Sequence, residues 1–307
     1  MRSEIRKDYI QDEYVIIAPK RGKRPNDIVI HCVPIKKTSG VCVFCPGAVE
    51  KNNTVLATQS TRSKKWDIMV IPNKFSAVTL DNPKAYGQQE VVIETAKHTE
   101  QFHKLSDAHV AKILEVYAQR TKIISKNPKI EYILIHKNTA GAGASIQHTH
   151  SQIFATSFLP PHLLDKSQKV QAYKLEHGRC VYCDVIKKES KGPRLVYQDK
   201  NVIAFTPYAS MYNYECWIMP QRHIDNITLL SAQERLSWAK ILKRVLNKIF
   251  MLELPYNYYF HQVVHDEDQH LYMKIVPRGS VWAGVEIGSG VIINPIAPEE
   301  AAKYFRR

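Results

Sequence analysis

Several features of membrane and secreted proteins are missing from this sequence. It has no apolar run of about 18 residues, the length that a membrane-spanning helix needs. Its first residues, MRSEIRKDYIQDEYVII, carry charges throughout and lack the apolar core of a signal peptide. Only 6 cysteines are present. We therefore expect a cytoplasmic protein in a reducing compartment, where paired cysteines bind metal or stay free.

A dedicated nucleic-acid-binding tract is also missing. The sequence has 43 Lys and Arg against 29 Asp and Glu, a net charge of +14, but the basic residues are spread along the chain. No aromatic–glycine pattern of an RNA-binding sheet occurs. The charge favours phosphates and nucleotides as ligands, although a solvated basic surface explains it equally well. With 44% hydrophobic residues, the 307-residue chain can bury a core in one large domain or two smaller ones.

One pattern of residues occurs twice, which indicates an internal duplication. The first half has a CxxC turn followed by a Glu and two separate histidines: Cys42, Cys45, Glu90, His98 and His148. The second half repeats this order: Cys180, Cys183, Glu215, His223 and His270. Residues 90–98 align without gaps on residues 215–223.

Each half also repeats the same expected secondary structure. Ser106 and Ser231 begin helices predicted over residues 108–124 and 233–250, and Ser231 with Glu234 forms a capping box. Strand-like runs follow at 130–135 and 256–264. The pattern predicts a duplicated α+β fold with mostly antiparallel sheets and flanking helices. We expect an N-terminal half over residues 1–160 and a C-terminal half over 170–307, connected by residues 160–178.

The cysteines and histidines predict two structural zinc sites. Zinc takes about four ligands in a tetrahedron, and a CxxC turn supplies two thiolates from one tight loop. The predicted ligands of the first site are Cys42, Cys45, His98 and His148, and those of the second site are Cys180, Cys183, His223 and His270. In the second site, His261 or His265 could replace His270. A single CxxC would be read as a reduced turn or a redox motif, but two with matching histidines favour metal.

The segment around His150 predicts catalysis. A small-residue loop, GAGAS at 141–145, precedes His148, His150 and Gln152. In a strand these three side chains share one face, with successive ones about 7 Å apart. The loop lets backbone N–H groups approach a phosphate closely. The alternative reading of HxH on a strand is a further metal ligand or a core histidine.

A neutral imidazole is a competent nucleophile near neutral pH. Attack of His150 on the α-phosphorus of a nucleotide diphosphate would form a phosphoramidate and divide one difficult transfer into two easier ones. Gln152 and Ser145 are expected to stabilise the phosphoryl oxygens. The His150 ring must be held in one tautomer by an acceptor such as a backbone carbonyl. The second half has Tyr272 and Lys274 at the corresponding positions, so we expect no catalysis there.

HTHSQ after the loop with Ser145, together with CVFCPG at 42–47, resembles the galactose-1-phosphate uridylyltransferases, a branch of the histidine-triad superfamily. APKRGKRP at 18–25 is similar to the family's N-terminal arginine motif, and IPNKF at 71–75 to its nucleotide-contacting strand end. WAGVE at 282–286, followed by INP at 293–295, is similar to its sugar-binding segment. The resemblance extends in order through almost the whole chain.

The resemblance implies duplicated histidine-triad-like units and a homodimer whose active sites are completed by the neighbouring subunit. It also implies a ping-pong reaction. UDP-glucose first uridylylates the enzyme and glucose 1-phosphate leaves. A second hexose 1-phosphate, which is galactose 1-phosphate in this family, then accepts the UMP group. His150 is then the nucleophile and Gln152 a phosphoryl contact, with zinc on the first Cys/His set. The residues implied to touch nucleotide, phosphates or hexose are Arg21, Arg24, Asn73, Asn138, Ser145 and Glu286.

Two departures from the family keep alternatives open. Thr149 stands where the family often has proline, a position that the chemistry should tolerate. The second CxxC is typical of relatives that include ADP-glucose phosphorylase, which uses inorganic phosphate as acceptor. An ADP-glucose phosphorylase or a nucleotidyl hydrolase is therefore the alternative within this chemistry. A zinc-stapled nucleic-acid-binding protein is the alternative from another class, and steep salt dependence of nucleic-acid binding without turnover would indicate it.

Overall fold

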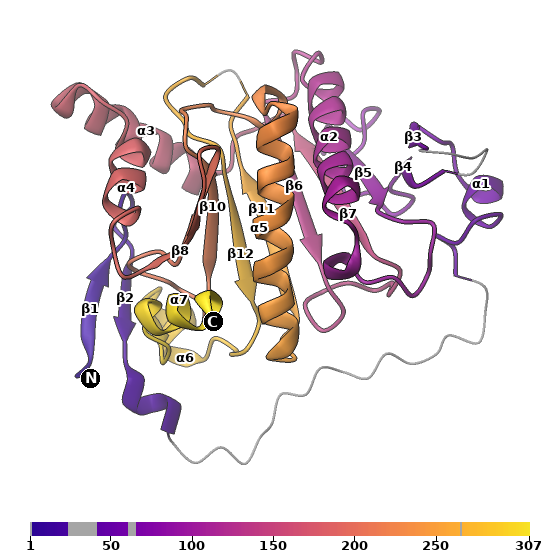
Figure 1. The fold of residues 1–307 in the computed structure, drawn as a ribbon. Coiled ribbons are helices and arrows are strands. Elements are labelled where there is room, and N and C mark those ends of the chain that lie inside the picture. The colour runs from indigo at the N-terminus through magenta and orange to yellow at the C-terminus, as the bar shows by residue number, and fades with distance from the viewer. Residues whose placement is uncertain (1, 24–41, 61–65, 265) are drawn as a thin grey trace.

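The computed structural model describes residues 2–23, 42–60, 66–264 and 266–307 (Figure 1). Arg24, Cys32 and His265 lie outside the described residues. Among the helices of the described ranges, none combines the length and apolarity needed to cross a membrane.

A 10-stranded sheet dominates the fold, and its strand order is β3-β4-β5-β7-β6-β11-β12-β10-β9-β8. The first five strands come from the N-terminal half: β3 Ala57–Gln59, β4 Ile68–Pro72, β5 Gly87–Ile93, β6 Tyr132–Asn138 and β7 His150–Thr156. The other five come from the C-terminal half: β8 Leu195–Gln198, β9 Val202–Phe205, β10 Cys216–Pro220, β11 Tyr256–His261 and β12 Tyr272–Pro277. Every pairing in this sheet is antiparallel.

The strand order of the second half mirrors that of the first about the contact between β6 and β11, where Tyr259 pairs with His136. Each half contributes five strands in the same relative order, as a duplication requires. The predicted α+β fold with antiparallel strands is therefore confirmed. The boundary between halves at 160–170 stays a prediction, because one continuous sheet joins them.

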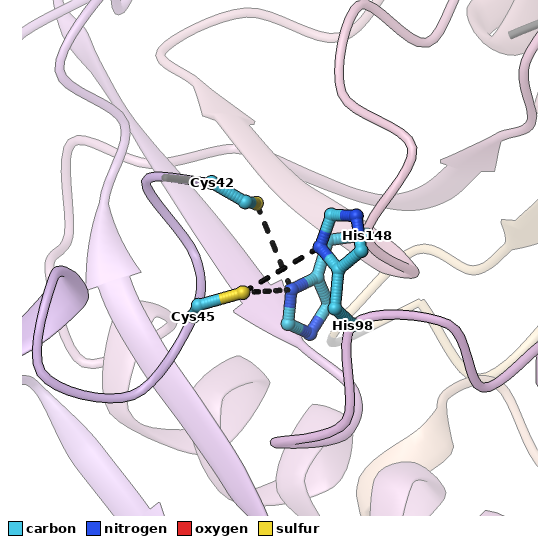
Figure 2. A group of neighbouring side chains, drawn as sticks. All are labelled: Cys42, Cys45, His98 and His148. Atoms are coloured by element: carbon cyan, nitrogen blue, oxygen red, sulfur yellow. Dashed lines mark hydrogen bonds between the residues drawn. The ribbon is translucent and has the colours of Figure 1, made fainter. Parts of the chain in front are cut away.

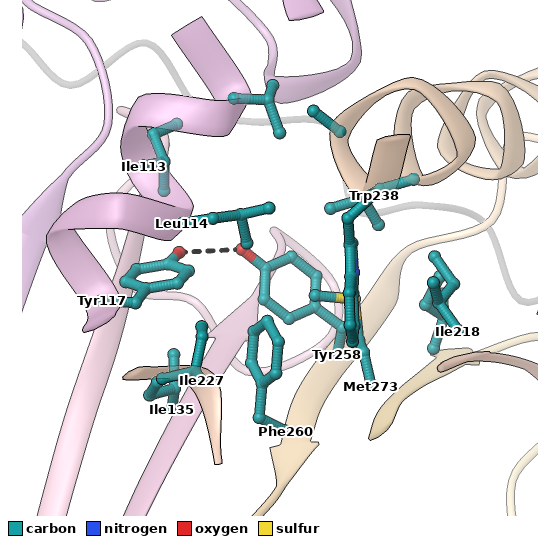
Figure 3. Close-up of a cluster of buried hydrophobic side chains, with 14 of the residues drawn as sticks. Ile113, Leu114, Tyr117, Ile135, Ile218, Ile227, Trp238, Tyr258, Phe260 and Met273 are labelled. Atoms are coloured by element: carbon teal, nitrogen blue, oxygen red, sulfur yellow. Dashed lines mark hydrogen bonds between the residues drawn. The ribbon is translucent and has the colours of Figure 1, made fainter. Parts of the chain in front are cut away.

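Two long helices cover one face of the sheet, α2 Asp107–Ile124 and α5 Ala232–Met251 (Figure 1). Both predicted helices are thus present. The Ser106 side chain accepts a hydrogen bond from the His109 N–H, and Ser231 with Glu234 forms the expected capping box. Under the helices, Tyr117, Trp238, Tyr258 and Phe260 belong to one apolar core shared by both halves (Figure 3).

Side chains alternate along the central strands between this core and the opposite face. On β6, Ile133 and Ile135 pack in the core, whereas Leu134 and His136 point to the opposite face. On β7, Ser151 and Ile153 lie on the helix side, so His150 and Gln152 lie on the other side. The face without α2 and α5 therefore carries the predicted catalytic residues.

A smaller sheet, of order β1-β2-β13, joins the two ends of the chain. Its strands are β1 Glu4–Lys7, β2 Tyr14–Ile17 and β13 Ile292–Asn294, and β13 pairs with β2 in parallel. The segment that we expected to connect the halves is mostly a helix, α3 Pro161–His177, which begins after Pro160 and ends at Gly178 with φ 69°. The remaining helical segments are η1 Pro19–Lys23, α1 Val49–Asn52, η2 Phe102–Lys104, α4 Val181–Glu189, η3 Ile227–Leu229, α6 Gly284–Ser289 and α7 Pro298–Arg306.

The gapless alignment of residues 90–98 on 215–223 is wrong within the strand. Val91 pairs with Gln152, and Trp217 pairs with Lys274, so Val91 and Trp217 are the equivalent residues. The gapless alignment instead places Val92 on Trp217. A shift of one residue turns a side chain to the opposite face of a sheet. Glu90 accordingly binds Arg120 on the helix side, whereas Glu215 binds Lys274 on the other face.

Candidate active site

The small-residue loop connects β6 to the histidine strand. Gly141 has φ 81° and Gly143 φ 99°, conformations that residues with a Cβ rarely adopt. A Cβ on Gly141 would also lie 3.3 Å from the Pro255 ring. The loop turns back on itself through hydrogen bonds from the Ala142 and Ala144 N–H groups to the Thr139 carbonyl. Ser145 is exposed at its end, where its hydroxyl is accessible to a ligand.

The His150 ring is held by a backbone carbonyl. Its Nδ1 lies 2.8 Å from the His148 carbonyl oxygen, so Nδ1 carries the proton and Nε2 keeps a free lone pair. This contact is the backbone-carbonyl acceptor expected for the His150 ring. Burial lowers the pKa of His150, and the nearby Lys137 ammonium lowers it further. The imidazole is therefore neutral near neutral pH, with Nε2 available for attack.

Two neighbouring amides orient Gln152. Its Oε1 accepts hydrogen bonds from Asn73 Nδ2 at 3.1 Å and from Gln89 Nε2 at 2.7 Å. With Oε1 occupied, the Gln152 –NH₂ group remains to donate to a ligand. Gln89 was missed by sequence reasoning. Alternation along β5 could have found it, since Gln89, Val91 and Ile93 share the face of His150.

A buried ion pair lies behind β7, on the helix side of the sheet. Lys137 binds the Glu94 carboxylate and donates to Thr149 Oγ1 and to the His150 carbonyl, both at 2.8 Å. Thr149 in turn donates to Glu94 at 2.7 Å. The residue that departs from the family's proline thus completes a hydrogen-bond network. Sequence reasoning missed Lys137 and Glu94, because nothing in their spacing indicates that the fold buries them together.

The first predicted metal cluster is assembled (Figure 2). The ligand atoms of Cys42, Cys45, His98 and His148 all lie within 4.8 Å of one another. Cys45 Sγ is 3.5 Å from His98 Nδ1 and 3.8 Å from His148 Nδ1. Tetrahedral zinc with its usual bond lengths gives S–N separations of about 3.6 Å. His148 Nε2 donates to the Thr95 carbonyl at 2.7 Å, which leaves Nδ1 facing the thiols.

The second predicted cluster is assembled except for His270. Ligand atoms of Cys180, Cys183 and His223 lie within 4.8 Å of one another. The His270 ring is 5.1 Å from the His223 ring, but its Nδ1 bonds the Leu271 carbonyl and its Nε2 is buried without a partner. His261, which could have replaced His270 as a ligand, is not part of the cluster, and its Nε2 lies 3.3 Å from Gln269 Oε1.

The remaining predicted residues fall in two places. Asn73 lies beside Gln152, and Asn138 lies next to the small-residue loop, where its Oδ1 accepts from Asn257. Arg21 and Glu286 instead lie near each other beside the small sheet. Hydrogen bonds from backbone N–H groups are the main cause of the lowered pKa of Glu286, and the nearby Arg21 charge lowers this pKa further. Strands β11 and β12 separate β7 from the elements that carry these two residues, η1 and α6 (Figure 1).

Comparisons with known proteins agree with this arrangement. Residues 2–160 match the family model described as galactose-1-phosphate uridyl transferase, N-terminal domain. ADP-glucose phosphorylase of Arabidopsis thaliana is 30% identical over 99% of this chain and 92% of its own length. Galactose-1-phosphate uridylyltransferase of Thermotoga maritima is 28% identical over 99% of this chain and 98% of its own. A crystal structure of the Arabidopsis thaliana phosphorylase with bound ADP-glucose superposes with a TM-score of 0.88, at 29% identity over 100% of this chain and 99% of that one.

Fold, site and relatives together define an enzyme of the nucleotidyltransferase class. The chain belongs to the galactose-1-phosphate uridyl transferase family.

Proposed function

We propose that the protein is a UDP-glucose–hexose-1-phosphate uridylyltransferase that works through a uridylyl-His150 intermediate. The observation that carries this proposal is the hydrogen bond from His150 Nδ1 to the His148 carbonyl, which directs a neutral Nε2 to the open face of the sheet. The Gln152 amide lies on the same face, with its oxygen already engaged. A nucleophile and a phosphoryl-binding donor thus share one face of one strand.

In the first half-reaction, His150 Nε2 attacks the α-phosphorus of UDP-glucose. The N–P bond forms while the bond from the α-phosphorus to the bridging oxygen breaks, and glucose 1-phosphate leaves with that electron pair. The positive charge that develops on the imidazole is stabilised by the His148 carbonyl at Nδ1. In the second half-reaction, a phosphate oxygen of galactose 1-phosphate attacks the same phosphorus, and the N–P bond returns its electrons to Nε2.

The donors around this phosphorus follow from the site. The Gln152 –NH₂ group, the Ser145 hydroxyl and the loop amides of residues 141–145 supply hydrogen bonds to the phosphoryl oxygens. Asn73 serves mainly to orient Gln152 in the free enzyme. We assign Asn138, which lies next to the loop, to the phosphates of the donor.

We propose that both Cys/His clusters hold zinc as a structural ion. The first offers two thiols and two imidazole nitrogens at separations that suit tetrahedral coordination. The second offers three ligands, and the buried unpartnered Nε2 of His270 supports this residue as the fourth. Zinc at such closed sites supplies folding free energy rather than an open position for substrate. The five described cysteines form no disulfide with one another, which supports a cytoplasmic location.

We further propose a homodimer in which Arg21, Arg24 and Glu286 complete the site of the neighbouring subunit. Arg21 and Glu286 lie beside the small sheet and away from β7 in their own chain. The segment around Glu286 exposes Val281, Val285 and Ile287, with exposed fractions of 74%, 55% and 74%. Contiguous exposed apolar side chains are typical of a protein–protein interface.

A second candidate function is that of an ADP-glucose phosphorylase, in which adenylyl replaces uridylyl and inorganic phosphate accepts it. The full-length similarity to the Arabidopsis thaliana enzyme favours it, as does the second Cys/His cluster. The His150 chemistry is the same in both, so only the nucleotide and the acceptor differ.

Intact-protein mass spectrometry separates the two. The protein is incubated with UDP-glucose or ADP-glucose in separate tubes without an acceptor. A uridylyl adduct that galactose 1-phosphate discharges establishes the uridylyltransferase. An adenylyl adduct that inorganic phosphate discharges establishes the phosphorylase, and the absence of any adduct overturns the covalent mechanism.

A further inference from the structure

A pocket of about 480 Å³ lies on the open face of the large sheet, separate from the histidine strand's catalytic residues. Its floor is formed by β6, β11, β12 and the end of β7, and its walls by the start of α3 and residues Gln11 and Glu13. Neither His150 nor Gln152 lines it, although Phe154 and Thr156 of the same strand do, as does Asn138 of β6. The pocket therefore needs an explanation of its own.

Lys166 of α3 brings to this pocket a positive charge without a close ion-pair partner. Its Nζ donates to the Tyr272 hydroxyl at 3.1 Å, but no carboxylate of the described residues lies within 4.0 Å of it. Burial lowers the pKa of Lys166, and the negative charges of Asp8 and Glu13 offset part of this effect. The second lysine of the pocket, Lys274, differs because Glu215 lies 3.1 Å away. A half-buried ammonium without a close ion-pair partner carries a desolvation cost, and an anion in the pocket would offset part of that cost.

The structure fixes the position of this charge. The Tyr272 ring stacks between Trp217 and His261, with centroid distances of 4.5 Å and 4.6 Å. Its hydroxyl is therefore a rigid acceptor that orients the Lys166 ammonium and leaves two N–H donors for a ligand. His162, in the first turn of α3, also lines the pocket, and the positive end of the helix dipole lies there.

The rest of the lining suits a sugar better than a bare ion. Tyr132, Leu134 and Phe154 offer apolar surface, while Glu13 offers a partner for hydroxyl groups. A volume of about 480 Å³ is also larger than inorganic phosphate needs, and pockets for small organic ligands begin at roughly 300 Å³. Glu13 places a negative charge in the same pocket, so the ligand needs both a phosphate and an uncharged polar part.

We propose that this pocket is a second, non-catalytic site for a phosphorylated monosaccharide, with its phosphate on Lys166 and its ring against Tyr132 and Phe154. Tyr272 stands where the first half has His150, and the pocket spans strands of both halves, from β7 and β6 to β11 and β12. This second binding site goes beyond the proposed function, and the proposal holds whether or not His150 forms a covalent intermediate. Inorganic phosphate shares the Lys166 chemistry and is the comparison ligand.

Titration calorimetry of the full-length protein with glucose 1-phosphate tests the proposal. Lys166→Met removes the charge, and Lys169→Met is the matched control, since Lys169 lies on the same helix but binds Asp12 outside the pocket. We expect Lys166→Met to lose one class of sites or to weaken it at least about tenfold, as loss of a charged hydrogen bond does. Lys169→Met should keep the affinity and stoichiometry of the wild type. Identical binding by Lys166→Met and the wild type overturns the proposal.

Two further measurements keep the test decisive. Lys166→Arg retains the charge and should retain the site, so loss in both Lys166→Met and Lys166→Arg with normal metal content overturns a charge-based role. Titration with inorganic phosphate separates the sources: equally tight Lys166-dependent binding overturns the sugar part of the proposal and supports a plain phosphate site. Adduct formation at His150 is measured in the same samples. A protein that binds glucose 1-phosphate in the pocket but forms no adduct would contradict the covalent mechanism and leave the pocket proposal standing.

Discussion

The side-chain nitrogen of Lys137 lies 2.8 Å from the carbonyl oxygen of His150. The same ammonium binds Glu94 and Thr149, and its side chain is 3% exposed. A charged group on the helix side of the sheet therefore anchors the backbone of the strand whose other face presents the candidate nucleophile. This arrangement connects the stability of the core to the geometry of the site.

Lys137→Met should lower the free energy of unfolding by about 3 kcal/mol or more, because Glu94 would remain buried without its cation. Urea denaturation measures this loss. The double variant Lys137→Met/Glu94→Gln removes both charges and should recover part of it. A double variant that is less stable by the sum of the two single losses would show that the pair does not act as a unit.

His150→Gly should abolish covalent nucleotidylation while the fold and the metal content remain, since His150 has no role in the proposed metal sites. Intact mass after incubation with the nucleotide sugar gives the result. The matched control is His136→Gly, on the neighbouring strand of the same face, which should still form the adduct. Retained labelling of His150→Gly would remove the nucleophile assignment.

Gln89→Leu should lower kcat roughly tenfold, since it removes one of the two hydrogen bonds that orient Gln152. Steady-state kinetics with saturating substrates measure the change. In a Gln152→Ala background the same substitution should have almost no effect, because the side chain it orients is gone. Equal effects in the two backgrounds would show that Gln89 acts by another route.

Cys42→Ser should lower the bound zinc by about one equivalent and reduce the melting temperature more than it changes substrate preference. Elemental analysis and thermal unfolding measure the two quantities. Chelation of the wild-type protein should reproduce the loss of stability. Cys216→Ser is the control, because Cys216 is buried in the core outside both clusters. Unchanged zinc in Cys42→Ser would exclude the first site.

Tyr272→Phe should leave kcat and the rate of His150 labelling nearly unchanged, because the proposed nucleophile His150 lies in the other half. Single-turnover labelling is the measurement. The variant retains the ring between Trp217 and His261, so its stability should also change little. A loss of labelling comparable to that of His150→Gly would show that the second half takes part in catalysis.

The sequence by itself determined the duplication and the two helices that Ser106 and Ser231 cap at their N-termini. It also determined which residues form the first metal cluster, namely Cys42, Cys45, His98 and His148. These follow from local rules: helix caps and apolar spacing act within a few residues, and metal ligands are recognisable by residue type. The family resemblance was readable for the same reason, since its central motif is contiguous.

The tertiary structure alone decided the rest. The register of β10 against β12 made Trp217 equivalent to Val91 rather than to Val92, and His270 is not among the ligands assembled in the second cluster. The contacts of Lys137 with Glu94, and of Gln89 with Gln152, join residues from different strands. Pairing register and burial depend on the whole set of packed side chains, so no local pattern in the chain specifies them.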